Sequence, residues 1–201
     1  MVRASDIRIR ELVDEMLYRE PSDDRDTVYV TDCVDCPMKS VLKRRNGHRV
    51  TREMLYGTVM HDVIVSRIAE KVGGETEVPV SVRVVHEDGQ FTLSGRADLV
   101  RGDTVYEFKF TEKPVDRRYL LQANAYAVLL GLPRYCIVAV TSRKTYLYCR
   151  DVDEEMYGEL IENAIKVHKL LNNVKVNFSH GDCRKCEYKN VCPVHRQSRL
   201  L

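Results

Sequence analysis

The stretch LSGRADLVRGDTVYEFKF occupies residues 93–110 and consists of two alternating runs on either side of Gly102-Asp103. Alternation around a Gly-Asp pair is typical of a β-hairpin with a two-residue turn. With that turn, Asp98 lies opposite Glu107 and Arg96 lies opposite Lys109, and the period of two places all four on one face of the sheet. The other face is expected to enter the core, and it carries Leu93, Ala97, Leu99, Tyr106, Phe108 and Phe110.

Two carboxylates that lie opposite each other on neighbouring strands repel, at a cost of up to about 1 kcal/mol. Arg96 and Lys109 repel in the same way, so a hairpin selected for stability alone would not hold both pairs. A divalent cation between Asp98 and Glu107 removes the first conflict, because oxygen ligands suit Mg²⁺ or Mn²⁺. Lys109 can then orient an attacking water or stabilise charge on a phosphate. The alternative is an exposed polar face with the ion pairs Arg96–Asp98 and Glu107–Lys109.

The periodicity of the remaining sequence predicts a mixed α/β domain with a central β-sheet flanked by helices. Helices are expected over residues 6–18, 37–46, 51–72, 116–130 and 153–172, and strands over 77–86, 90–101, 104–110, 135–141 and 144–150. Ser5 and Thr51 are the expected N-caps of the first and third helices. The chain then divides into an N-terminal helical segment (1–50), a core (51–172) and a cysteine-rich segment (173–201) that packs with residues 33–45.

Three polar residues on the predicted helices are further candidates for the site. His61 interrupts an apolar stripe on its helix, and Gln122 and Tyr126 share one helix face because they lie four residues apart. Ordinary core packing explains each of these three residues equally well when it is taken alone. The stripe consists of Met54, Gly57, Ile64, Ile68 and Val72.

Taken in order, four motifs resemble the motif set of the RecB-type nucleases. They are Gly57-x-x-x-His61, Gly95-Arg96-Ala97-Asp98, Glu107-x-Lys109 and Gln122-x-x-x-Tyr126. These nucleases belong to the PD-(D/E)xK superfamily, whose restriction-endonuclease-like core is a mixed sheet flanked by helices. The resemblance covers about residues 57–126.

The resemblance also implies a role for each residue of these motifs. His61, Asp98 and Glu107 would bind a metal ion, with the Phe108 carbonyl as a further ligand. Asp98, Glu107 and Lys109 would be the catalytic residues. Arg96, Gln122 and Tyr126 would contact DNA or support the site.

Five of the seven cysteines gather near the two ends of the chain. The N-terminal part contains Cys33-x-x-Cys36, and the C-terminal part contains Cys183-x-x-Cys186 followed by Cys192. Clustered thiolates are ligands of iron–sulfur clusters or of zinc. The other two, Cys136 and Cys149, fall in β-rich segments and are expected to be buried small hydrophobic residues, since thiols stay reduced in the cytoplasm.

This cysteine pattern is similar to that of the iron–sulfur RecB nucleases, which include AddB, the nuclease part of the Dna-two helicases and the Cas-four family of CRISPR systems. The Cas-four family is the most similar, because the chain is short and has no helicase motifs. The resemblance implies an iron–sulfur cluster, 4Fe-4S rather than 2Fe-2S, on Cys36, Cys183, Cys186 and Cys192. Cys33 is the alternative to Cys36, and a zinc ion on four cysteines is the alternative to the cluster.

The net charge of +2 does not by itself argue for a nucleic-acid partner. Basic residues do concentrate over residues 39–52, where they could follow a phosphate backbone or form a solvated helix face. No apolar run reaches the roughly 18–20 residues that span a bilayer, and the first residues lack the apolar core of a signal peptide. A cytoplasmic protein without membrane contact is therefore expected.

Beyond the site, the resemblance implies a Mg²⁺- or Mn²⁺-dependent exonuclease that acts mainly on single-stranded DNA, with endonuclease activity as a further option. It implies a role in CRISPR spacer acquisition, with the CRISPR integrase complex and further copies of the chain as partners. Two other functions stay open. One is a non-catalytic DNA-binding or assembly subunit, and the other is a DNA-repair nuclease that works with a separate helicase.

Overall fold

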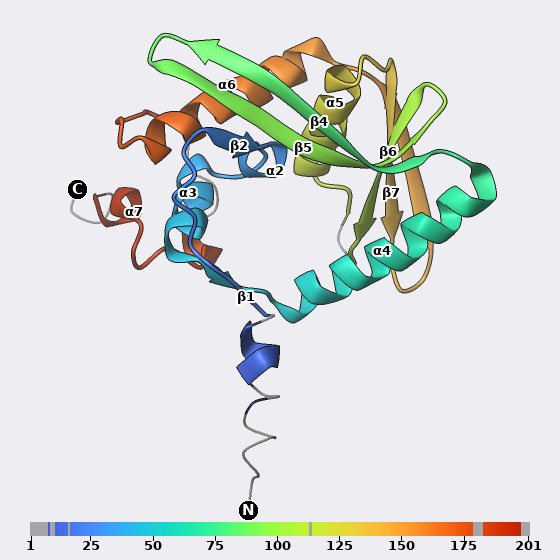
Figure 1. The fold of residues 1–201 in the computed structure, drawn as a ribbon, viewed down its shortest axis with the longest axis horizontal. Helices are drawn as coiled ribbons and strands as arrows, with labels where there is room; N and C mark the ends of the chain where they lie inside the picture. The colour runs from blue at the N-terminus through green and yellow to red at the C-terminus, as the bar shows by residue number, and fades with distance from the viewer. Residues whose placement is uncertain (1–7, 9–10, 16, 113, 179–182, 198–201) are drawn as a thin grey trace, which may run out of the picture.

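The structure, a computed structural model, describes residues 8, 11–15, 17–112, 114–178 and 183–197. Among them, six strands form one mixed sheet in the order β2-β5-β6-β7-β8, with β4 also paired to β5. Helices flank this sheet, as the sequence predicts (Figure 1). The strands are β1 (Tyr18–Arg19), β2 (Thr27–Tyr29), β3 (His48–Arg49), β4 (Glu75–His86), β5 (Gly89–Arg101), β6 (Thr104–Phe110), β7 (Arg134–Val140) and β8 (Thr145–Asp151). The helices are α2 (Val30–Cys33), α3 (Pro37–Asn46), α4 (Arg52–Val72), α5 (Arg117–Leu129), α6 (Glu154–Leu171) and α7 (Pro193–Gln197), with a 3-10 turn at Cys183–Lys185.

Strands β5 and β6 form the predicted hairpin, but their ladder is shorter than expected. It pairs Arg101 with Thr104 and ends at Leu99 and Tyr106. The predicted pairs Asp98–Glu107 and Arg96–Lys109 are therefore wrong.

The reason is that β5 changes its neighbour along one edge. At residues 92–94 this edge pairs with the parallel strand β2, while β4 covers the opposite edge from residue 89 to residue 100. Between its contacts with β2 and β6, residues 95–98 have no strand partner on this edge among the described residues. The sheet is therefore open at the point where the sequence places Arg96 and Asp98.

The apolar side of the hairpin is divided between two clusters of buried residues. Leu93 and Ala97 belong to the main core, which includes residues of α5 and α6. Leu99 and Phe108 instead pack against Val65 of α4. The prediction of one continuous apolar face is thus corrected, because a strand as long as β5 twists along its length.

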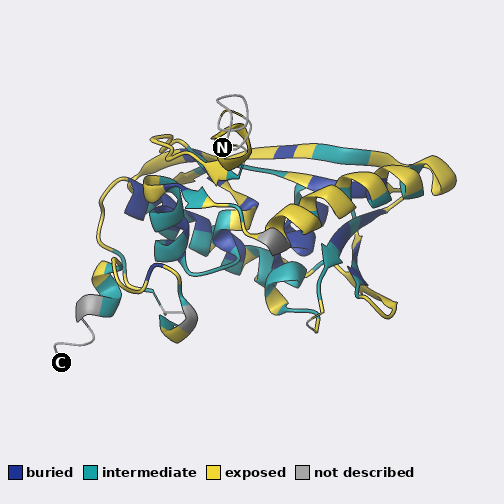
Figure 2. Ribbon diagram, turned by 90° about the horizontal axis from the view of Figure 1, so that it is seen from below, coloured by how far each residue is buried: buried dark blue, intermediate teal, exposed yellow. Residues whose placement is uncertain are grey.

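Helix α4 begins as predicted, since the Thr51 side chain accepts a hydrogen bond from the Met54 N–H at 3.2 Å. The predicted stripe is only partly right, because Met54 and Val72 are exposed and the buried residue is Val65. Most of α4 is coloured as exposed in Figure 2. The predicted apolar stripe is not buried as a whole, because the first half of the helix borders a pocket. The contact with the core lies further along, at Val65. None of the described helices, α4 included, is long and apolar enough to cross a membrane.

The N-terminal part differs most from the expected pattern. Residues 11–15 are helical, but the expected cap Ser5 lies outside the described residues and Tyr18 belongs to strand β1 rather than to the helix. Tyr18 pairs with Arg49 of β3, and its hydroxyl donates a hydrogen bond to the Asn46 carbonyl at the end of α3. Such a two-residue strand has no period of its own, so local sequence could not reveal it.

Two residues of the basic stretch serve the fold rather than a phosphate backbone. Arg44 is largely buried and forms an ion pair with Asp32 at 2.6 Å. Arg45 donates hydrogen bonds to the Leu170 and Leu171 carbonyls, where α6 ends and its carbonyl groups lack helical partners. Both guanidinium groups therefore have partners within the chain.

Candidate metal and active site

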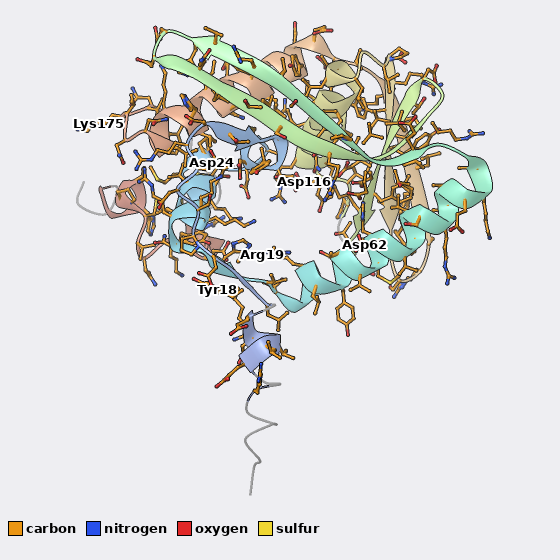
Figure 3. All side chains as sticks on the ribbon, in the orientation of Figure 1. Tyr18, Arg19, Asp24, Asp62, Asp116 and Lys175 are labelled. Carbon is orange, nitrogen blue, oxygen red and sulfur yellow. A yellow bond between two sulfur atoms is a disulfide. The ribbon has the colours of Figure 1, made fainter. Side chains whose placement is uncertain are left out.

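A pocket of about 870 Å³ lies at the opening of the sheet. Elements that are far apart in the sequence line it: α4 contributes His61, β5 contributes Asp98, β6 contributes Glu107 and Lys109, and α5 contributes Gln122. In Figure 3 the labelled Asp62 marks the part of α4 that carries His61. The structure thus brings together the polar residues that the sequence analysis selected from separate helices and strands.

The side chain of Asp98 bridges β5 and β6 beyond the point where their backbone ladder ends. Its Oδ2 accepts a hydrogen bond from the Phe108 N–H at 2.7 Å, in place of the ladder bond that the splayed strands no longer make. Its Oδ1 lies 3.0 Å from Nε2 of His61. Because Asp98 is 8% exposed, this carboxylate is fixed in place by the backbone of the neighbouring strand. The Phe108 carbonyl stays a predicted ligand.

His61 faces Asp98 without a well-formed hydrogen bond. The Asp98 contact raises the pKa of His61 to about 9, although partial burial opposes this shift. Nevertheless, Nε2 of His61 is buried and has no partner of hydrogen-bonding geometry among the described residues. The interaction is therefore mainly one of charge, and the nitrogen lies where a cation shared with Asp98 could replace the proton.

Glu107 carries the clearest sign of a ligand. Its side chain is 1% exposed, and Oε1 accepts a hydrogen bond from Nζ of Lys109 at 2.7 Å. Its Oε2 is buried with no hydrogen-bond partner in the described part of the chain. Burial raises the pKa of this carboxyl group, Lys109 opposes the shift, and Asp98 adds to it. A buried carboxylate oxygen without a partner is costly, and a divalent cation would satisfy it.

Lys109 is held between two acceptors. Besides Glu107, Nζ donates to Oε1 of Gln122 at 3.0 Å, and it lies 5.2 Å from the ring centre of Tyr119. Burial lowers the pKa of this ammonium, but the charge of Glu107 outweighs that and raises it. Lys109 is therefore a fixed positive charge at the wall of the pocket.

Gln122 and Tyr126 are buried residues of α5 that line the pocket. The Gln122 amide donates to the Tyr126 hydroxyl at 3.3 Å, and the Tyr126 side chain is almost fully enclosed. A Cβ at Gly95 would lie 2.6 Å from the Tyr126 ring. The glycine of the Gly95-Arg96-Ala97-Asp98 motif is therefore required for the close approach of this ring to β5.

The structure adds one residue that the sequence analysis missed. Glu77 of β4 joins His61 and Asp98 in a group whose ligand atoms all lie within 4.8 Å of one another. Its carboxylate also forms an ion pair with Nε of Arg96. Nothing in the sequence distinguishes Glu77 from other surface acids, because its position depends on the pairing of β4 with β5.

The cysteines at the two ends differ in their environments. Cys33 is fully buried, and its thiol donates a hydrogen bond to the Tyr29 carbonyl at 3.3 Å. Burial raises the pKa of Cys33 far above its usual range. Cys36 begins α3 and is half-buried, as are Cys183, Cys186 and Cys192. Because a ligand thiol must ionise and be reachable, these environments favour Cys36 over Cys33.

Cys136 is buried as expected, but the expectation of a buried thiol is wrong for Cys149, and neither residue is reduced. The two residues lie directly opposite each other on β7 and β8, and their sulfurs form a disulfide. Cys149 is exposed, whereas Cys136 is buried. The pairing arises from the register of the hairpin, which local sequence does not specify in advance.

Known protein families and curated proteins give no match to this sequence. Solved structures do. The chain shares its fold with two of them. The protein SSO0001 has a TM-score of 0.68 at 20% identity, over 96% of this chain and 97% of that one. LHK-Exo, an alkaline exonuclease from Laribacter hongkongensis solved in complex with dAMP, has a TM-score of 0.51 at 14% identity, over 89% of this chain and 97% of that one.

Proposed function

We propose that the chain is a metal-dependent DNA nuclease that hydrolyses phosphodiester bonds, mainly at the ends of single-stranded DNA. The observation that carries this proposal is the buried Glu107, whose free Oε2 lines the same pocket as Asp98, His61 and Lys109. Two acids, an imidazole nitrogen and a fixed ammonium in one pocket suit phosphoryl chemistry better than they suit a stable core.

In this proposal each residue has a distinct task. Asp98, Glu107 and Nε2 of His61 hold a Mg²⁺ or Mn²⁺ ion, and the Phe108 carbonyl is a further ligand. Such an ion acidifies bound water and neutralises the charge that develops on the phosphate. Lys109 stays protonated between Glu107 and Gln122, so it stabilises negative charge on the reacting phosphate or orients the attacking water.

The shared fold supports this function. LHK-Exo, which shares this fold, is an alkaline exonuclease and has been solved in complex with dAMP. The pocket volume is large enough for a nucleotide, since ligand pockets commonly measure about 300–1,000 Å³.

The direct test is degradation of end-labelled DNA, single-stranded and double-stranded, with Mn²⁺ or Mg²⁺ and with chelator. Asp98→Ala should abolish the cleavage that the wild type shows. Asp103→Asn is the matched control, because this acid lies in the hairpin turn away from the pocket. Equal cleavage by the wild type and Asp98→Ala would refute the nuclease. Binding of DNA by a wild type that never cleaves would favour a non-catalytic subunit.

We further propose an iron–sulfur cluster of the 4Fe-4S type on Cys36, Cys183, Cys186 and Cys192. The type of donor supports this proposal, because all four are half-buried cysteines outside the disulfide, whereas Cys33 is enclosed. Cys183 and Cys186 share one turn, in which the Cys186 N–H donates to the Cys183 carbonyl at 3.3 Å. Iron and sulfide analysis of anaerobically purified protein tests this. Stoichiometric zinc without sulfide would overturn it.

The biological setting proposed is the processing of DNA before CRISPR spacer integration. It rests on the resemblance of the four motifs and the cysteine spacing to the Cas-four family. DNA repair beside a separate helicase is the competing setting. Co-purification with an integrase encoded by a neighbouring gene would support the first, and a neighbouring helicase gene would support the second.

A further inference from the structure

We infer that Glu77 is a further protein ligand of the cation in this pocket, through its Oε1. This inference rests on the proposed metal-dependent nuclease and extends its site to a third strand, β4. Neither the four sequence motifs nor their resemblance includes this residue.

The register between β4 and β5 places Glu77 near Asp98. The β4–β5 ladder pairs Thr76 with Leu99 and Val78 with Ala97, so the residue opposite Asp98 is Glu77. Although these two residues are not themselves paired in the ladder, their carboxylates belong to one group of atoms within 4.8 Å of one another. Asp98 therefore lies close to a second carboxylate besides that of Glu107. A shared cation removes the repulsion between these carboxylates.

The backbone of Glu77 also has an unusual conformation. Glu77 has a φ of 56°, in the left-handed region that a residue with a side chain rarely adopts. The same ladder is interrupted there, because no Glu77–Asp98 pair appears between its two neighbours. Strained residues of this kind concentrate at ligand-binding sites. Glu77 combines this backbone conformation with a place in the group of ligand atoms that includes His61 and Asp98.

The two oxygens of the Glu77 carboxylate have different neighbours. Oε2 of Glu77 pairs with Nε of Arg96, while Oε1 lies 3.5 Å from Nδ1 of His61. One oxygen is thus held by a guanidinium, and the other lies beside the imidazole that is proposed to bind the cation. The independent sign that a ligand is required is Glu107, whose buried Oε2 has no partner among the described residues and lines the same pocket.

Calorimetric titration of the purified protein with Mn²⁺ tests the inference without relying on cleavage. Glu77→Gln should weaken Mn²⁺ binding by at least about tenfold, as loss of a direct or supporting ligand usually does. Glu77→Gly should weaken it equally while leaving the thermal midpoint unchanged or higher, because glycine tolerates the left-handed backbone. Comparing Glu77→Gln with Glu77→Gly therefore separates the effect of the carboxylate from the effect of the left-handed backbone.

Two controls complete the experiment. Asp62→Asn removes a carboxylate that also lies 3.5 Å from Nδ1 of His61 but is 70% exposed, so it should change affinity by less than about threefold. If the Glu77→Gln variant binds Mn²⁺ no more weakly than the Asp62→Asn variant does, Glu77 is not a ligand. Asp98→Asn reports on the proposed function itself: if it loses Mn²⁺ while Glu77→Gln does not, only the inference fails. If Asp98→Asn also binds like the wild type, the metal site as a whole fails.

Discussion

The sheet opening and the cysteine segments are organised in different ways. At the opening, side-chain contacts join residues of α4, β5, β6 and α5 into one network, from His61 through Asp98 to Gln122. The cysteine segment is held by short backbone turns, such as the bond from the Cys192 N–H to the Tyr188 carbonyl. The fold itself therefore assembles the site at the sheet opening. In the second region, a ligand would contribute much more to the structure.

The largest effect is expected from Glu107→Gln. It removes the buried carboxylate and one partner of Lys109, so DNA cleavage should fall on the order of 10³-fold, as loss of one preorganised electrostatic group does. The visible spectrum and the thermal midpoint should change little, because the cysteine region does not depend on this pocket. Steady-state cleavage and a thermal melt measure both. A bleached spectrum would break the separation of the two regions.

Cys186→Ala should have the opposite profile. It should remove the visible absorption and lower stability by about 4 kcal/mol, since a cross-link between residue 36 and residues 183–192 closes a very long loop. For a chain of this length that corresponds to a thermal midpoint roughly 8–16 °C lower. Cys33→Ala is the matched control and should keep its colour. Colour lost in Cys33→Ala but kept in Cys36→Ala would exchange the two assignments.

Gln122→Ala should reduce cleavage by about 10–100-fold. Its Oε1 accepts from Lys109, and its amide donates to Tyr126, so the variant frees the ammonium without touching the acids. Mn²⁺ affinity measured by calorimetry should therefore match the wild type. A loss of metal binding in this variant would mean that the support and the metal ligands are one unit.

Cys149→Ser should have the smallest effect on function. The Cys136–Cys149 disulfide joins residues 13 apart, and losing a loop of this size costs about 3 kcal/mol at most. Urea unfolding of the variant should match that of the reduced wild type, while cleavage and colour stay intact. Loss of colour here would show that the two groups of cysteines are not independent.

The sequence by itself determined the local elements and the types of residue at the site. The hairpin turn at Gly102-Asp103, the cap at Thr51, and the acids and lysine at positions 98, 107 and 109 all follow from period, turn chemistry and charge. These features are local, so nearby residues specify them.

Tertiary structure decided which of these residues meet. β5 pairs with β2 at residues 92–94 and with β6 only from Leu99 onward, so the Asp98 carboxylate accepts the Phe108 N–H, while the separate pairing of β4 with β5 brings Glu77 beside Asp98. The disulfide and the exposed first half of α4 have the same kind of origin. Strand order and register depend on contacts between segments distant in the chain, and no local pattern carries that information.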